Sequence, residues 1–129
     1  MPVFISYSRK DKEFALKLSK LLVARNHYIW IDEWEVNAGE SLISTIQDAV
    51  QNASVLLAIF SKASMKSIWC KKEVNAGIQR ELEERKVVVI PVKLDNCRIP
   101  LFLREKRYAD FRTNFDEGFS TVDQALAKP

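Results

Sequence analysis

Trp69 and Glu73 are the two residues whose types and spacing best suit chemistry on a bound molecule. They lie four positions apart in a stretch with helical periodicity, so the indole ring and the carboxylate share one helix face. A carboxylate placed there can stabilise a positive charge that develops during a reaction. A single helix glutamate is usually just solvated, and a single tryptophan is often a core residue, so the prediction depends on their pairing and location.

Three polar segments that follow apolar runs supply further candidate groups. They span residues 6–12, 32–41 and 61–69, and each is long for a plain connection. In an open parallel sheet, ligands bind beyond the carboxyl ends of the strands, which is where these segments are expected. They contain two cations suited to a phosphate, two indoles suited to stacking, and several hydroxyls: Arg9, Lys10, Trp34, Trp69, Ser6, Ser8, Ser61 and Ser64.

Other familiar sites are absent from the sequence. Neither the glycine-rich dinucleotide motif nor the P-loop motif occurs among the three glycines. His27 is the sole histidine, so we interpret it as a strand-edge residue rather than part of a triad or a metal cluster. Cys70 and Cys97 make neither a disulfide framework nor a zinc site, and we expect idle thiols in a reducing compartment. We predict no metal site.

The elements that must position these groups alternate between strands and helices. Residues 3–7, 28–31, 55–60 and 87–92 are β-rich runs, and 108–111 is a candidate short edge strand. The runs of the first half are continuously apolar, which is typical of strands covered on both faces. We therefore predict an α/β fold: a flavodoxin-like three-layer sandwich with a four- or five-stranded parallel sheet and helices on both faces.

Helices are predicted between these strands by apolar residues that recur on one face. Ser8 and Asp11 form an S-x-x-D start signal for the first helix. A second helix is expected over 42–53, and a third from Ser64 or Ser67 to about Lys86, with 80–86 as a solvated face. The first and last helices have these predicted inward positions: Phe14, Leu18, Leu21, Leu22, Phe115, Phe119, Val122 and Leu126.

Length and composition favour one domain over residues 1–129. The chain is 47% hydrophobic and 29% charged, which is ordinary globular composition. A net charge of +3 without a long basic block favours neither direct nucleic-acid binding nor an acidic membrane. The first ten residues lack a signal-peptide pattern, and the longest strongly apolar run, 55–60, is far shorter than the roughly 20 residues of a membrane helix. We expect a cytoplasmic location.

Four segments together resemble a known family. VFISYSRKD at the start, WIDEWEVNAGESL after the second strand, VLLAIFS at the third strand and SIWCKKEV at the third helix occur in order. They resemble successive signature segments of Toll/interleukin receptor (TIR) domains, in the style of bacterial members. The likeness covers nearly the whole chain, and the combination is specific where a single segment would not be.

The resemblance implies an activity and a set of site residues. In its enzymatic branch, TIR domains cleave NAD to nicotinamide and ADP-ribose or a cyclic product, so NAD is a substrate and no cofactor is expected. The catalytic glutamate of the W-x-x-x-E segment matches Glu73. Some animal enzymes carry arginine where this chain has Ser8 and an aromatic residue where it has Ser41. The substrate-binding residues implied are Tyr7, Ser8, Arg9, Trp34, Ser41 and Trp69.

The family also implies self-association with other TIR domains. The loop that follows the second strand matches the segment with which family members reach a neighbouring domain. Its exposed apolar residues among acidic ones are typical of a contact surface. The residues of this self-association loop are Asp32, Glu33, Trp34, Glu35, Val36, Asn37, Ala38, Gly39 and Glu40.

Two other functions fit the same fold. In a non-enzymatic signalling module, the same loops make TIR–TIR contacts and Glu73 is idle. A two-component receiver needs an acidic cluster after the first strand and an aspartate after the third, whereas Ser6 and Ser61 stand near those strand ends. The first alternative stays open, and release of nicotinamide from NAD separates it from the enzyme.

Overall fold

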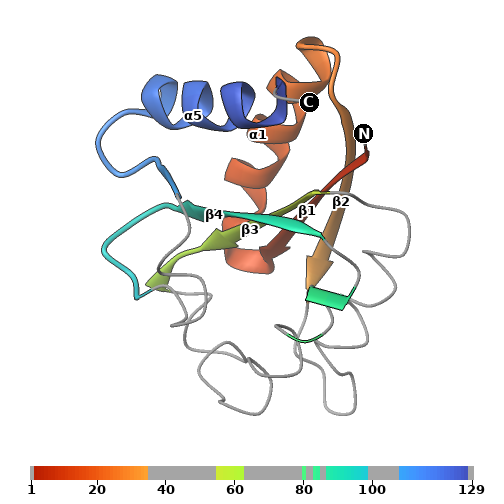
Figure 1. Ribbon diagram of the computed structural model, residues 1–129. Coiled ribbons are helices and arrows are strands. Elements are labelled where there is room, and N and C mark those ends of the chain that lie inside the picture. Colours follow the sequence, from red (N-terminus) through yellow and green to blue (C-terminus); the bar gives the residue numbers. More distant parts are fainter. Residues whose placement is uncertain are drawn as a thin grey trace.

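The computed structural model describes residues 2–34, 55–62, 80, 83–84, 87–98 and 108–127 (Figure 1). The five predicted strands and the first and last predicted helices are present. In chain order the elements are β1 (Pro2–Ser8), the short 3-10 helix η1 (Arg9–Asp11), α1 (Lys12–Ala24), β2 (Tyr28–Trp34), β3 (Val55–Phe60), β4 (Val88–Lys93), β5 (Ala109–Asp110) and α5 (Phe115–Ala127).

The five strands form one parallel sheet in the order β2-β1-β3-β4-β5. Val3 of β1 is level with Ile29 of β2 on one side and with Val55 of β3 on the other. The chain therefore runs outward from β1 to β2 and then returns past β1 to β3. This reversal is the switch point of a flavodoxin-like sheet, so the predicted fold class is confirmed.

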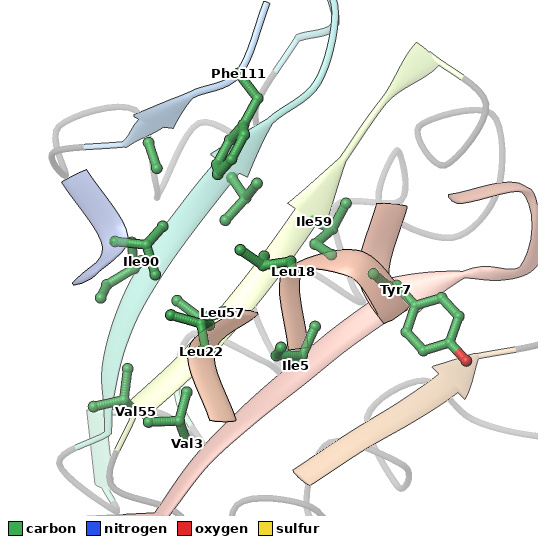
Figure 2. Close-up of a cluster of buried hydrophobic side chains, with 14 residues drawn as sticks. Val3, Ile5, Tyr7, Leu18, Leu22, Val55, Leu57, Ile59, Ile90 and Phe111 are labelled. Carbon is green, nitrogen blue, oxygen red and sulfur yellow. The ribbon is translucent and has the colours of Figure 1, made fainter. Parts of the chain in front are cut away.

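The helices α1 and α5 lie on the same face of the sheet (Figure 1). Beneath them is the main hydrophobic core, built from alternate residues of the strands (Figure 2). Residues on the opposite face of the central strands are buried too, as the continuous apolar runs predicted. On that face the buried side chains include Phe4, Leu56, Ala58, Phe60 and Val89.

The predicted second and third helices fall mostly outside the described residues. Arg80, Glu83 and Glu84 are helical and exposed, in agreement with a solvated helix face at this point of the chain. Among the described residues, no helix is long and apolar enough to cross a membrane.

The buried face of α1 is rotated by about one residue from the predicted one. Leu18 and Leu22 are completely buried, Ala15 joins them, and Phe14 packs against the core. Leu21 is 39% exposed, so its predicted inward position was wrong. The buried face of α1 contains Ala15, Leu18 and Leu22, and Leu21 lies to one side of this face.

α1 ends in a left-handed residue that turns the chain back towards the sheet. Asn26 has a φ of 67°, which asparagine tolerates better than most residues. The backbone N–H of Asn26 donates to the Val23 carbonyl at 3.0 Å, and that of His27 donates to the Leu22 carbonyl at 3.1 Å. These two hydrogen bonds form a Schellman motif, which satisfies the last carbonyls of the helix.

Asp123 of α5 fastens that turn to the last helix. Its carboxylate accepts a hydrogen bond from Arg25 at 2.9 Å and lies 2.8 Å from His27 Nε2. The hydrogen bond with His27, followed by that from Arg25, lowers the pKa of Asp123. His27 was expected at a strand edge, and it directly precedes β2 with this structural partner.

β2 is longer than the sequence suggested. Asp32 was expected to begin a loop, yet the strand continues to Trp34, with Asp32 level with Ser6 and Trp34 level with Ser8. The prediction of a loop was wrong for these three residues because polar composition does not by itself indicate a loop. A strand at the end of the sheet order pairs through its backbone on one side and tolerates polar residues.

Candidate functional site

The parallel strands bring several polar residues to the carboxyl edge of the sheet. Ser8 is the last residue of β1, Ser61 directly follows β3, and Asp95 comes two residues after β4. Asp110 ends β5. The switch point between β1 and β3 lies on the same edge, so this edge is the candidate site.

Asp11 connects the exits of β1 and β3. The Ser61 hydroxyl donates to Oδ2 of Asp11 at 2.8 Å, and the Ser8 hydroxyl donates to the same oxygen at 3.2 Å. The S-x-x-D signal was expected to cap a helix through the backbone, but Ser8 makes no such capping bond with its side chain. The two side chains bind each other instead, because η1 separates Ser8 from the start of α1.

Asp95 connects the exits of β3 and β4. Both of its carboxylate oxygens accept from the backbone N–H of Lys62, at 3.0 and 3.1 Å. Nearby, the N–H of Leu94, the first residue after β4, donates to the carbonyl of Phe60, the last residue of β3, at 3.0 Å. The chain is therefore held on two sides at the residues that follow β3.

A third carboxylate fixes the β5 end of this edge. Asp110 accepts from Arg112 Nη2 at 2.8 Å and from Arg112 Nε at 2.9 Å, while Nη1 of the same arginine donates to Asn96 at 2.9 Å. The hydrogen bonds from the Arg112 side chain and then from its backbone lower the pKa of Asp110 to about 2. Asp110 is thus an anion throughout the physiological range.

Cys97 lies beside Asp95 and is buried, with 6% of its surface exposed. Burial, followed by the charge of Asp95, raises the pKa of its thiol. The thiol is therefore protonated at physiological pH, and the absence of a chemical role for Cys97 stays a prediction. Cys70 lies outside the described residues. In the described ranges, histidine, cysteine and acidic side chains form no group of three that could hold a metal ion.

The predicted substrate-binding residues of the first segment occupy different environments. Tyr7 is 5% exposed and belongs to the core cluster, although Figure 2 shows its ring pointing away from the aliphatic side chains. Ser8 is half-buried, and its hydroxyl donates a hydrogen bond to Asp11. Arg9 and Lys10 are exposed in η1, at the carboxyl edge. A role in substrate binding stays a prediction for Tyr7, Ser8 and Arg9.

The remaining predicted site residues are only partly covered by the described ranges. Asp32, Glu33 and Trp34 close β2 at the carboxyl edge, where the backbone of Trp34 is level with Ser8. The other predicted residues lie outside the described residues, and their roles stay predictions: Glu35, Val36, Asn37, Ala38, Gly39, Glu40, Ser41, Trp69 and Glu73.

Sequence reasoning missed Asp11, Asp95 and Asp110 as parts of this edge. A signal was present, since Asp95 and Asp110 each follow or end an apolar run. Asp11 was noticed only as a helix start. In the structure these three carboxylates accept hydrogen bonds from neighbouring residues of the chain, so they hold together the segments at this edge of the sheet.

Comparison with known proteins supports the family resemblance. The family model described as the TIR domain matches residues 3–124. The 2′ cyclic ADP-D-ribose synthase BtTIR of Bacteroides thetaiotaomicron is 31% identical over 87 residues, which make up 67% of this chain and 30% of that protein. The NAD(+) hydrolase TcpA of a Theionarchaea archaeon is 27% identical over 88 residues, 67% of this chain and 27% of that protein. The matches thus span less than a third of either relative.

A solved structure supports the same fold. The crystal structure of the TIR domain of the Toll-related receptor TRR-2 from Hydra magnipapillata superposes with a TM-score of 0.70. The match covers 98% of both chains at 19% sequence identity. Since the family model matches most of the sequence and the sheet has the corresponding fold, the chain belongs to the TIR domain family.

Proposed function

We propose that this TIR domain cleaves NAD to nicotinamide and ADP-ribose or a cyclic ADP-ribose, with Glu73 as the catalytic carboxylate. The observation that carries the proposal is the similarity to two proteins named as a 2′ cyclic ADP-D-ribose synthase and an NAD(+) hydrolase. The W-x-x-x-E spacing of Trp69 and Glu73 adds to it, because it provides the one carboxylate that the reaction needs.

The described part of the sheet offers a suitable place for a dinucleotide. The switch point between β1 and β3 opens at the carboxyl edge, where ligands bind in folds of this kind. Arg9 and Lys10 are exposed at that edge, and their charge suits a pyrophosphate. Ser61 and Lys62, which precede Trp69 and Glu73 in the sequence, directly follow β3 at the same edge.

The chemistry requires little more than one well-placed anion. The nicotinamide of NAD is already cationic, so it can leave without a general acid. The ribose that remains has oxocarbenium character, and a carboxylate near its hydroxyls stabilises that positive charge. Water then gives ADP-ribose, while a hydroxyl of the same molecule gives a cyclic product. This chemistry requires no metal.

Glu73→Gln tests the proposal, since the amide keeps the size of the side chain and removes its charge. We expect nicotinamide release to fall at least about a hundredfold, the scale of one preorganised electrostatic group. Glu84→Gln is the matched control, because it makes the same charge change at an exposed helical position. Nicotinamide is measured by chromatography and folding by circular dichroism.

Two results would speak against the enzyme. Near-normal turnover in folded Glu73→Gln would refute the role of Glu73. Absence of nicotinamide release from the unmodified chain, at every protein concentration that permits assembly, would favour the non-enzymatic signalling module in which Glu73 is idle.

A further inference from the structure

We infer that Asp11 and Asp95 are positioning residues that together set where the chain leaves β3. Asp11 holds the side chain of Ser61, and Asp95 holds the backbone N–H of Lys62. These are successive residues, and they directly follow the last residue of β3. The two carboxylates reach this point from opposite neighbours in the sheet, since Asp11 follows β1 and Asp95 follows β4.

The hydrogen bonds of Asp11 and Asp95 are better suited to fixing the backbone after β3 than to stabilising an exposed surface. Ser61 is 4% exposed, and its hydroxyl is one of the few polar groups in the buried set of the described residues. Asp11 and Ser61 are 50 positions apart in sequence, and Asp95 and Lys62 are 33 apart. Each bond therefore ties a distant segment to the exit of β3, and the two act on different atoms of one dipeptide.

The consequence for catalysis rests on the proposed function. Glu73 follows Lys62 along the same chain, so the placement of its segment begins at this fixed dipeptide. A displacement of about 1 Å at a reacting group can cost around a hundredfold in rate. Losing either carboxylate should therefore lower kcat for NAD more than it raises KM, because the interaction with the transition state is the one that depends most on position.

Asparagine and alanine variants separate geometry from charge. The hydroxyls of Ser8 and Ser61 donate to the same oxygen of Asp11, so the single amide oxygen in Asp11→Asn can keep both hydrogen bonds. In Asp95→Asn one of the two acceptors for the Lys62 N–H remains. We expect kcat to fall at least about tenfold in Asp11→Ala and Asp95→Ala and to stay within about threefold of the parent in both asparagine variants.

Hydrogen exchange of the Lys62 amide gives a readout that does not need enzymatic activity. Asp95→Ala removes its acceptor directly. If the two carboxylates act together, Asp11→Ala and Ser61→Ala should also speed up this exchange, although neither touches the Lys62 N–H. Asp123→Ala is the matched control. It removes a carboxylate of α5 that also has two partners, Arg25 and His27, in the turn before β2. It should leave Lys62 exchange and kcat unchanged.

The outcomes distinguish the two proposals. If Lys62 exchange responds only to Asp95→Ala, the joint role of Asp11 is wrong, whatever the activity. If exchange responds as expected and the unmodified chain releases no nicotinamide, the proposed function fails and the anchoring of the β3 exit stands. If the unmodified chain is active and folded Asp11→Ala and Asp95→Ala keep full kcat, the positioning role is overturned.

Discussion

Trp69 precedes Glu73 by four positions, and its substitution distinguishes a stacking residue from a core residue. If its ring holds the departing base or folds the adenine over the ribose, Trp69→Ala should lower activity or change the ratio of cyclic to linear product. A lost core aromatic would instead cost about 3–5 kcal/mol of stability. Thermal melts beside product chromatography decide, and a large melting drop with an unchanged product ratio would support the core role.

At the residue scale, the sequence identified polar groups at the strand ends but not the contacts that they make. Ser8 and Ser61 were predicted as polar groups at strand ends. The sequence did not predict that Asp11 accepts a hydrogen bond from Ser61, or that Asp95 accepts one from the backbone N–H of Lys62. The reason is physical: the bonds join residues 50 and 33 positions apart, and only the order of the strands brings them together. Local patterns carry no information about such partners. The roles of Trp69 and Glu73 stay predictions.

Gly118 of α5 packs closely against the ring of Phe111. A Cβ at this position would lie 2.6 Å from Cγ of Phe111, whose ring also contacts Phe14 with centroids 4.9 Å apart. Gly118→Ala gains helix propensity of about 1 kcal/mol, but overpacking costs about 1–3 kcal/mol. We expect net destabilisation in a denaturant titration. Ser120→Ala, at an exposed position of α5, should not destabilise, and an equal effect of both would contradict the packing argument.

At the element scale, burial on both faces made the strands predictable. β3 was predicted with its observed bounds because all six of its residues are apolar and buried. β2 was predicted three residues short, since Asp32 and Glu33 are polar residues of a strand at the end of the sheet order. The helix α1 was predicted with its inward face slightly rotated, because leucine spacing alone could not show that Ala15 rather than Leu21 meets the sheet.

For the whole molecule, we predict that activity depends on self-association through residues 32–40. Four acidic side chains in this segment need basic partners on another face of the next molecule, which favours a head-to-tail contact that propagates. Specific activity should then rise with protein concentration, and Trp34→Ala should lower both assembly and turnover while the monomer stays folded. Light scattering and nicotinamide release across a dilution series measure this. A fully active monomer, indifferent to dilution and to Trp34→Ala, would sink the idea.

Acid should weaken the attachment of α5 through Asp123. Its pKa is lower in the folded chain than in the unfolded chain, so its contribution is complete above the unfolded value near 4 and is lost as pH falls through the folded value. Because the ion pair is partly solvated, we expect about 1 kcal/mol at neutral pH. Asp123→Asn should lower the melting temperature at pH 7 and flatten its decline in acid. Identical acid profiles for both proteins would contradict this role.

The position of β1 has a consequence for synthesis. Within this domain it is synthesised before the other strands, yet it lies inside the sheet, between β2 and β3. β2 can cover one side soon afterwards, but β3 begins only at Val55. Until then the other edge of β1 and its apolar faces are open to neighbouring nascent chains. The order of synthesis thus differs from the order of pairing, and we expect the unpaired edge of β1 to be most exposed to aggregation before β3 has emerged.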